Sequence, residues 1–217
     1  FVNGDYHLAK YYGLDSTKLS AIDRGETYFD NDTMKQGFFK LGANVRFRSK
    51  DFISRWMYDV QTNYQYFSCQ EKLREHTIHT KLNGAYRFET SSLHLDFDMH
   101  NIIMSLPANT RGYSFVPGET LNNYTVIKLT PSYYFSGDIG EINVGVRGAF
   151  SIHQGKKGAV TPDVYGKVKL IKNALSVYAG VTGDYIVNNY QYMTEINPYI
   201  SVDTRVADTY MPIDAYV

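Results

Sequence analysis

The chain has 217 residues with 22 basic and 22 acidic side chains, so its formal net charge is zero. A neutral chain lacks the basic field that nucleic acid requires, and we expect no nucleic-acid partner. The sequence holds no run of about eighteen apolar residues, which argues against a membrane-spanning helix. It is rich in aromatic residues, which both fill soluble β cores and form girdles at bilayer interfaces.

The first half of the chain predicts a strand and two long hairpins. Residues 1–12 give a weak strand, and the polar residues 15–34 are rich in turn-forming types. Between Phe39 and Phe47, and again between Trp56 and Tyr66, apolar residues alternate with polar residues or glycine. Successive strand side chains point to opposite faces, so each arm has one apolar and one polar face. Residues 76–88 and 93–103 repeat the pattern as a second hairpin, after a polar loop over 68–75.

The second half continues in the same way. Two further hairpins pair residues 125–135 with 142–152, and 160–170 with 175–183. We expect a short helix over 187–196, which ends before Pro198, and a tenth strand from Met211 to Val217. Turns near residues 50, 90, 138 and 172 are short, whereas connections near 70, 113, 155 and 197 are longer. The prediction is an all-β, antiparallel up-and-down meander of about ten strands in one domain, residues 1–217.

The long strands favour a transmembrane β-barrel, or part of one. Ordinary strands run about five or six residues, whereas a membrane-crossing strand needs roughly nine to eleven. The polar face carries full charges, which suits a watery lumen better than a dry core. The residues expected to face the lumen are Lys40, Arg46, Arg55, Asp59, Lys81, Arg87, Asp96, Asp98, Arg147, Lys167 and Lys169. The residues expected to face lipid are Phe39, Leu41, Val45, Phe47, Trp56, Leu95, Phe97, Val144 and Val146.

Four ligand-type side chains share one face of one strand: His94, Asp96, Asp98 and His100. Alternate strand residues lie nearly 7 Å apart by rise alone, so all four cannot reach one ion. A neighbouring pair could do so only with help from the adjacent strand. If Phe88 pairs with Leu93, Arg87 lies opposite His94 and Lys81 opposite His100. We therefore expect a ladder of charges rather than a metal site.

Three arginines crowd the turn of the first hairpin, where the sequence predicts that Arg46 lies opposite Arg55. Like charges in that position are unfavourable unless anionic groups lie nearby. These groups would come from missing strands or a plug, or the lumen would attract anions at this mouth. No catalytic constellation, cofactor motif or zinc spacing is present, and no enzymatic activity, cofactor or metal is expected.

The segment from Thr161 to Tyr199 resembles the late barrel of Bacteroidota outer-membrane proteins of the TonB-dependent-receptor-like or porin-like kind. The sequence YAGVTG at 178–183, followed by Asn189-Tyr190 and Asn197-Pro198-Tyr199, carries the resemblance. The family implies an outer-membrane location in a Gram-negative bacterium. Its members usually have more strands and end on an aromatic residue, whereas this chain ends on Val217. The comparison therefore suggests a fragment of a larger barrel, and no TonB box or plug motif is visible.

Three functions fit these observations. The first is a barrel that passes or imports a small solute across the outer membrane, with the bilayer as its surroundings. The second is a structural or secretion-complex barrel without an open pore, bound to other outer-membrane or periplasmic proteins. The third is a soluble β-rich binding domain.

Overall fold

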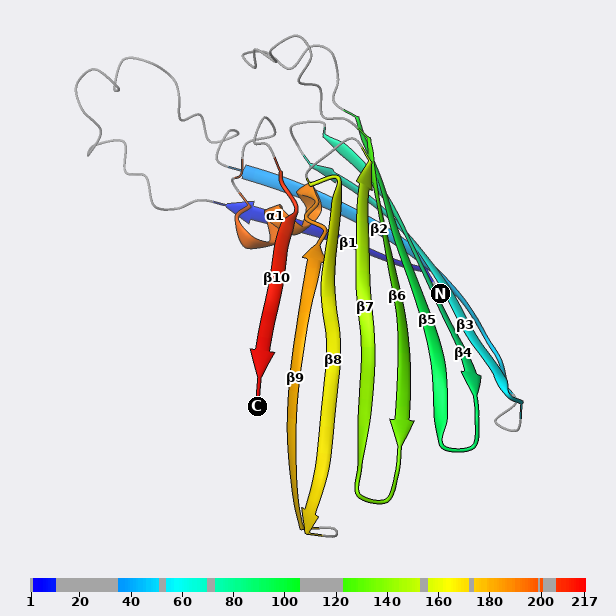
Figure 1. Cartoon of the computed structure of the whole chain (residues 1–217). Helices are drawn as coiled ribbons and strands as arrows, with labels where there is room; N and C mark the ends of the chain where they lie inside the picture. The colour runs from blue at the N-terminus through cyan, green and yellow to red at the C-terminus, as the bar shows by residue number, and fades with distance from the viewer. Residues whose placement is uncertain are drawn as a thin grey trace, which may run out of the picture.

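The computed structural model describes residues 2–10, 35–50, 54–69, 73–105, 123–152, 156–171, 174–198, 200 and 206–217. They form one ten-stranded antiparallel sheet in which every strand pairs with its neighbours along the chain (Figure 1). The strands are β1 (Val2–Lys10), β2 (Lys35–Arg48), β3 (Trp56–Cys69), β4 (Arg74–Arg87), β5 (Ser91–Ser105), β6 (Tyr124–Ser136), β7 (Gly140–Ile152), β8 (Gly158–Ile171), β9 (Leu175–Ile186) and β10 (Thr209–Tyr216). A single short helix, α1 (Tyr190–Ile196), precedes β10 within the described residues. The predicted all-β antiparallel meander is confirmed.

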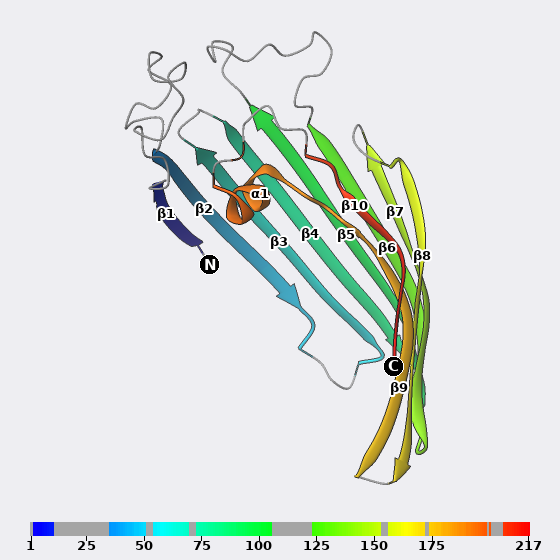
Figure 2. The ribbon, with the colours of Figure 1, turned by 90° about the vertical axis from the view of Figure 1, so that its left-hand side faces the viewer.

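The sheet curves, and its two faces differ. Helix α1 lies against the concave face (Figure 2), where Glu195 of the helix contacts Lys40 of β2. The pairing register then assigns each strand's alternate residues to this face, because cross-strand partners share a face. In the described residues β1 and β10 do not pair with each other, so the sheet is open at both edges.

The buried apolar side chains gather at the upper end of the concave face, the end where α1 lies. Phe67 of β3, Tyr124 of β6 and Tyr190 of α1 are almost fully buried there, and Phe67 and Tyr190 have ring centroids 6.4 Å apart. The core is thus a local contact between the helix and the wall. It is not a layer that runs the length of the sheet.

Both predicted hairpin registers are wrong by an even number of residues. Arg46 lies opposite Gln61 in the sheet, not opposite Arg55, which precedes β3 in a bend. In the second hairpin His79, rather than Lys81, lies opposite His100. Because side chains alternate with a period of two, even shifts leave every residue on its predicted face.

The predicted loops need two corrections. Residues 68–75 are not a loop, because β3 extends to Cys69 and β4 begins at Arg74. The connections over 70–73 and 153–157 are short, although they lie at the same end as the long ones over 11–34, 106–123 and 187–208. The opposite end carries 49–55, 88–90, 137–139 and 172–174. Long loops therefore occur only at the upper end, but that end also carries the two short connections over 70–73 and 153–157.

Candidate functional site

The concave face carries ten of the eleven charged residues predicted to face a lumen. They are Lys40, Arg46, Asp59, Lys81, Arg87, Asp96, Asp98, Arg147, Lys167 and Lys169, each on the helix side of its strand by register. The eleventh, Arg55, lies outside the strands, in the bend before β3. Whether this face surrounds water inside a closed barrel remains a prediction.

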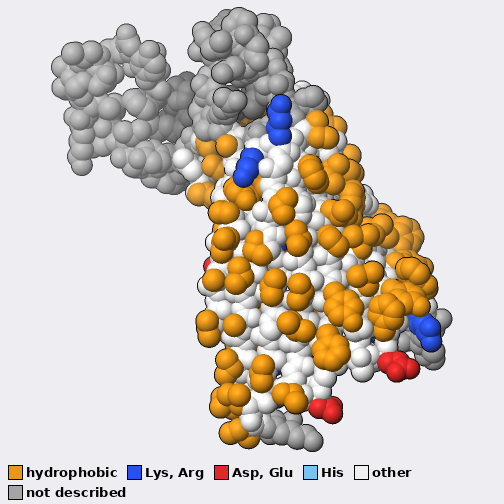
Figure 3. All heavy atoms as spheres, viewed as in Figure 1, with side chains coloured by type: hydrophobic (Ala, Val, Ile, Leu, Met, Phe, Trp, Pro, Cys, Tyr) orange, Lys and Arg blue, Asp and Glu red, His pale blue; other side chains and the backbone are white. Residues whose placement is uncertain are grey.

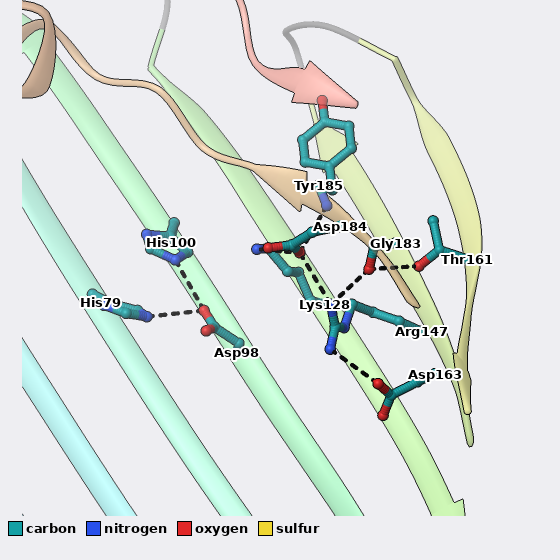
Figure 4. A network of polar contacts seen from close by, with 10 residues as sticks. All are labelled: His79, Asp98, His100, Lys128, Arg147, Thr161, Asp163, Gly183, Asp184 and Tyr185. Atoms are coloured by element: carbon teal, nitrogen blue, oxygen red, sulfur yellow. Dashed lines mark hydrogen bonds and ion pairs between the residues drawn. The ribbon is translucent and has the colours of Figure 1, made fainter. Parts of the chain in front are cut away.

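One ionic network joins four strands across the curve of the sheet (Figure 4). Asp184 of β9 lies 3.2 Å from the Nζ atom of Lys128 on β6 and 3.4 Å from a guanidinium nitrogen of Arg147 on β7. Arg147 also pairs with Asp163 of β8 at 3.6 Å and donates to the carbonyl oxygen of Gly183 at 2.7 Å. Two cations and two anions balance locally. Because β6 and β9 are not neighbours in the sheet, these contacts tie the curved wall together.

A second cluster lies further along the same face (Figure 4). Asp98 Oδ1 is 2.9 Å from His79 Nε2 and 3.0 Å from His100 Nε2. The two imidazole rings stack, with centroids 3.8 Å apart. The sequence placed Asp98 and His100 on one face, but the wrong register hid His79 as their partner. Asp96 and His94 do not join this cluster, and His94 instead bonds Ser92 Oγ at 2.7 Å.

One arginine at the basic end of the first hairpin has an acidic partner within the described chain. Arg46 forms a two-pronged ion pair with Asp59, one strand away on β3. The acidic partner of Arg46, expected from missing strands or a plug, is therefore Asp59 of the same hairpin. The Arg46 and Asp59 side chains are 50% and 25% exposed, so solvent screens the pair and its contribution to stability is small.

Residues 187–197, called the strap below, cross the upper concave face from β9 to β2. Asn189 caps α1 by accepting from the Tyr192 amide at 3.0 Å, as a helix N-cap residue does. The buried Glu75 of β4 accepts from the Tyr190 amide and from the Asn189 side chain, each at 2.8 Å. At the far end, Lys40 Nζ lies 2.6 Å from Glu195. These contacts hold the strap to the wall at β4 and β2.

The start of the strap is held by residues near β10 and β6. Asp208 accepts from the Asn188 amide at 3.0 Å and from the Tyr185 hydroxyl at 3.1 Å. The Tyr124 hydroxyl donates to the carbonyl oxygen of Asn188. Burial raises the pKa of Asp208 above its ordinary value, against the opposing effect of the Asn188 amide. Sequence reasoning expected the helix but missed Glu75, Tyr124 and Asp208, because each meets its partner only in the folded chain.

A cavity of about 350 Å³ lies between the strap and the wall. Its lining includes Asn63 and Gln65 of β3, His79 and His100 of the histidine–aspartate cluster, and Gln191 and Glu195 of α1. The lining is therefore mainly amide, imidazole and carboxylate groups, which bind polar solutes or cations rather than apolar ones.

The part of the convex face seen in Figure 3 is covered mostly by apolar side chains, with charged side chains visible only towards its ends and margins. The nine residues predicted to face lipid all lie on the face opposite the helix. Phe39, Val45, Leu95 and Val144 are 42%, 53%, 45% and 50% exposed, and Phe97 is the one residue of the nine that is partly buried. They form no sealed interior, and contact with lipid stays a prediction.

Aromatic rings gather on the convex face at both ends of the first hairpins. At the lower end the Trp56 and Tyr86 rings meet at 4.8 Å. At the upper end Phe39 packs on Tyr66 at 6.1 Å, and Tyr66 on His76 at 5.0 Å. Two aromatic groups with aliphatic residues between them are typical of a surface that crosses a bilayer.

Comparison with known proteins found no matching family, no matching curated protein and no matching solved structure. Among the described residues, no helix is long and apolar enough to cross a membrane. The site is therefore interpreted from its own geometry.

Proposed function

We propose that these ten strands form the wall, or part of the wall, of an outer-membrane β-barrel in a Gram-negative bacterium. We further propose that small polar solutes pass along its concave face. The two-faced sheet is the observation that carries the proposal. Its charged groups lie with the strap on the concave face, and its apolar groups cover the convex face.

Water is a poor solvent for this convex face. Exposed large hydrophobic side chains outnumber buried hydrophobic ones among the described residues. Soluble monomers rarely expose apolar patches larger than a few hundred Å². A bilayer removes this cost, because the apolar groups meet lipid chains while the strand pairing satisfies the backbone N–H and C=O groups.

Strand length supports the same conclusion. Strands β2 to β9 have between 12 and 15 residues each. A strand tilted by about 45° needs roughly nine to eleven residues to cross the hydrocarbon core. Each of these strands is therefore long enough to cross the hydrocarbon core. The remaining residues at its ends would lie in the interfaces, where aromatic residues are expected. The resemblance to Bacteroidota barrels points the same way.

The position of the strap determines how wide a passage the concave face could form. It lies across the upper concave face and fills space that a plain barrel would leave to water, so we propose that it narrows the lumen. A barrel without an open pore, bound to other envelope proteins, is the alternative that the strap favours. Ionic conductance distinguishes the two.

The single tryptophan tests the membrane contact directly. Trp56 is 69% exposed on the convex face, so its fluorescence in liposomes should be quenched by lipids brominated near the headgroup end of the acyl chain. The control carries Trp56→Phe with Met57→Trp, which moves the indole to the next residue and the concave face. That variant should respond to aqueous iodide instead. Equal quenching of both proteins by brominated lipid would contradict the assignment of faces.

Conductance in planar bilayers tests the passage. Asp96 lies on the concave wall, so Asp96→Lys should change the ratio of cation to anion permeability. Glu89→Lys changes the net charge equally in the exposed turn before β5 and should alter the ratio less. Conductance that is unaffected by Asp96→Lys counts against solute passage along this face. Absence of conductance favours the closed alternative.

A further inference from the structure

We propose that His79, Asp98 and His100 form a binding site for a divalent transition-metal ion on the concave face. One ligand atom from each residue lies within 4.8 Å of the other two. Two imidazoles and one carboxylate are ligand types that zinc, iron(II), cobalt(II) and nickel(II) accept. This inference concerns binding alone and does not require that the barrel conducts solutes.

The strands bring the ligands together for a geometric reason. His79 and His100 are direct cross-strand partners, and Cβ atoms in such a pair lie about 4.5–5.5 Å apart. Asp98 precedes His100 by two positions on the same strand and turns its Oδ1 to both rings. Two neighbouring strands thus bring three ligand atoms close together, whereas the four ligand-type residues along β5 alone are too far apart to share one ion.

The spacing is close to what an ion needs. Metal–ligand bonds of about 2.0–2.2 Å place adjacent ligand atoms roughly 3 Å apart, and Oδ1 lies 2.9 and 3.0 Å from the two Nε2 atoms. The rings now stack at 21° between their planes. To bind one ion, each ring would have to turn about its Cβ–Cγ bond until both Nε2 lone pairs point at it. A metal binds the neutral imidazole, so each Nε2 would carry no hydrogen in the complex and the ring hydrogen would be on Nδ1.

The surroundings admit an ion and leave it room for further ligands. All three side chains are 20–27% exposed, so hydrated metal reaches them without unfolding. His79 and His100 line the 350 Å³ cavity beneath the strap, which Glu195 also lines. An ion held by three residues keeps positions open, and these would be taken by water or by a chelating solute in the cavity.

Titration calorimetry of the full chain in detergent, with Zn²⁺ as the probe, tests the proposal. We expect one equivalent of tight binding. Asp98→Asn, His79→Gln and His100→Gln should each weaken the affinity by about 100-fold or more. His94→Gln is the matched control, because His94 lies on the same strand and face but outside the cluster. It should bind as the wild type does.

Two further measurements keep the test decisive. Co²⁺ absorption bands should appear in the wild type and the His94→Gln variant and be lost in the other three. Circular dichroism shows whether each variant keeps its sheet, and Asp98→Asn preserves both size and a hydrogen-bond acceptor. Wild-type binding weaker than about 1 mM, or equal weakening in His94→Gln and His100→Gln, would overturn the site and leave the cluster as a hydrogen-bonded contact.

Discussion

Replacing Glu75 with alanine tests whether this one carboxylate holds the strap against the wall. Glu75 is fully buried and accepts from the Tyr190 amide and the Asn189 side chain at 2.8 Å. Removing this acceptor leaves two donors unsatisfied in a buried site, which costs about 1–3 kcal/mol for each donor. The desolvation of the carboxylate offsets part of this sum. We expect the docking of the strap to weaken by about 3 kcal/mol, which is roughly a 100-fold rise in the undocked fraction.

Hydrogen exchange of the α1 amides measures that fraction without assuming a pore. In Glu75→Ala the exchange of α1 should accelerate by about 100-fold, while the central residues of β4 and β5 keep their wild-type rates. Glu75→Gln retains one carbonyl oxygen as an acceptor. Its α1 amides should therefore exchange faster than those of the wild type and more slowly than those of Glu75→Ala. Glu141→Ala removes a concave-face carboxylate at the other end of the wall, where it bonds Tyr134. This control should leave α1 protected.

The same variant connects structure to passage. If the strap narrows the lumen, Glu75→Ala should also raise single-channel conductance. Glu141→Ala leaves the strap docked and should not raise the conductance. Unchanged α1 exchange in Glu75→Ala would refute the reasoning, because the two donors would then be satisfied without this carboxylate.

Three other substitutions test the fold around the strap. A Cβ at Gly183 would lie 2.5 Å from the carbonyl oxygen of Pro212, so Gly183→Ala should lower the free energy of unfolding by about 1–3 kcal/mol; Gly166→Ala, which meets nothing within 4 Å, should be neutral in urea titrations. Burial raises the pKa of Asp208, so the fold favours its protonated form; this stabilisation is complete below the ordinary carboxyl pKa and is lost as pH rises through the raised pKa. Asp208→Asn should therefore gain stability relative to the wild type as pH rises through that window, and a constant difference would contradict the assignment. Lys40→Ala removes a half-exposed ion pair and should speed α1 exchange by less than tenfold, since such pairs contribute about 1 kcal/mol or less.

Alternation in the sequence predicted the strands and their faces because a period of two is a local property. Phe39, Val45 and Val144 lie on the convex face, and Arg46 and Asp96 on the concave one, as expected. The strap was only half-predicted. The helix was expected over 187–196, but nothing near Asn189 in the sequence indicates Glu75, 114 residues away, as its partner.

The predicted registers were wrong, and the polar pairs on the concave face show how the predicted and observed registers differ. The expected pairing of β4 with β5 puts Lys81 opposite His100 and Arg87 opposite His94. The observed pairing puts Lys81 opposite Asp98 and His79 opposite His100. Cross-strand pairs of opposite charge contribute about 0.2–1 kcal/mol, and like charges cost a similar amount. Both registers bury and expose the same faces, so the apolar side cannot choose between them. The polar pairs differ between the two registers, and the observed register brings both histidines to one carboxylate oxygen.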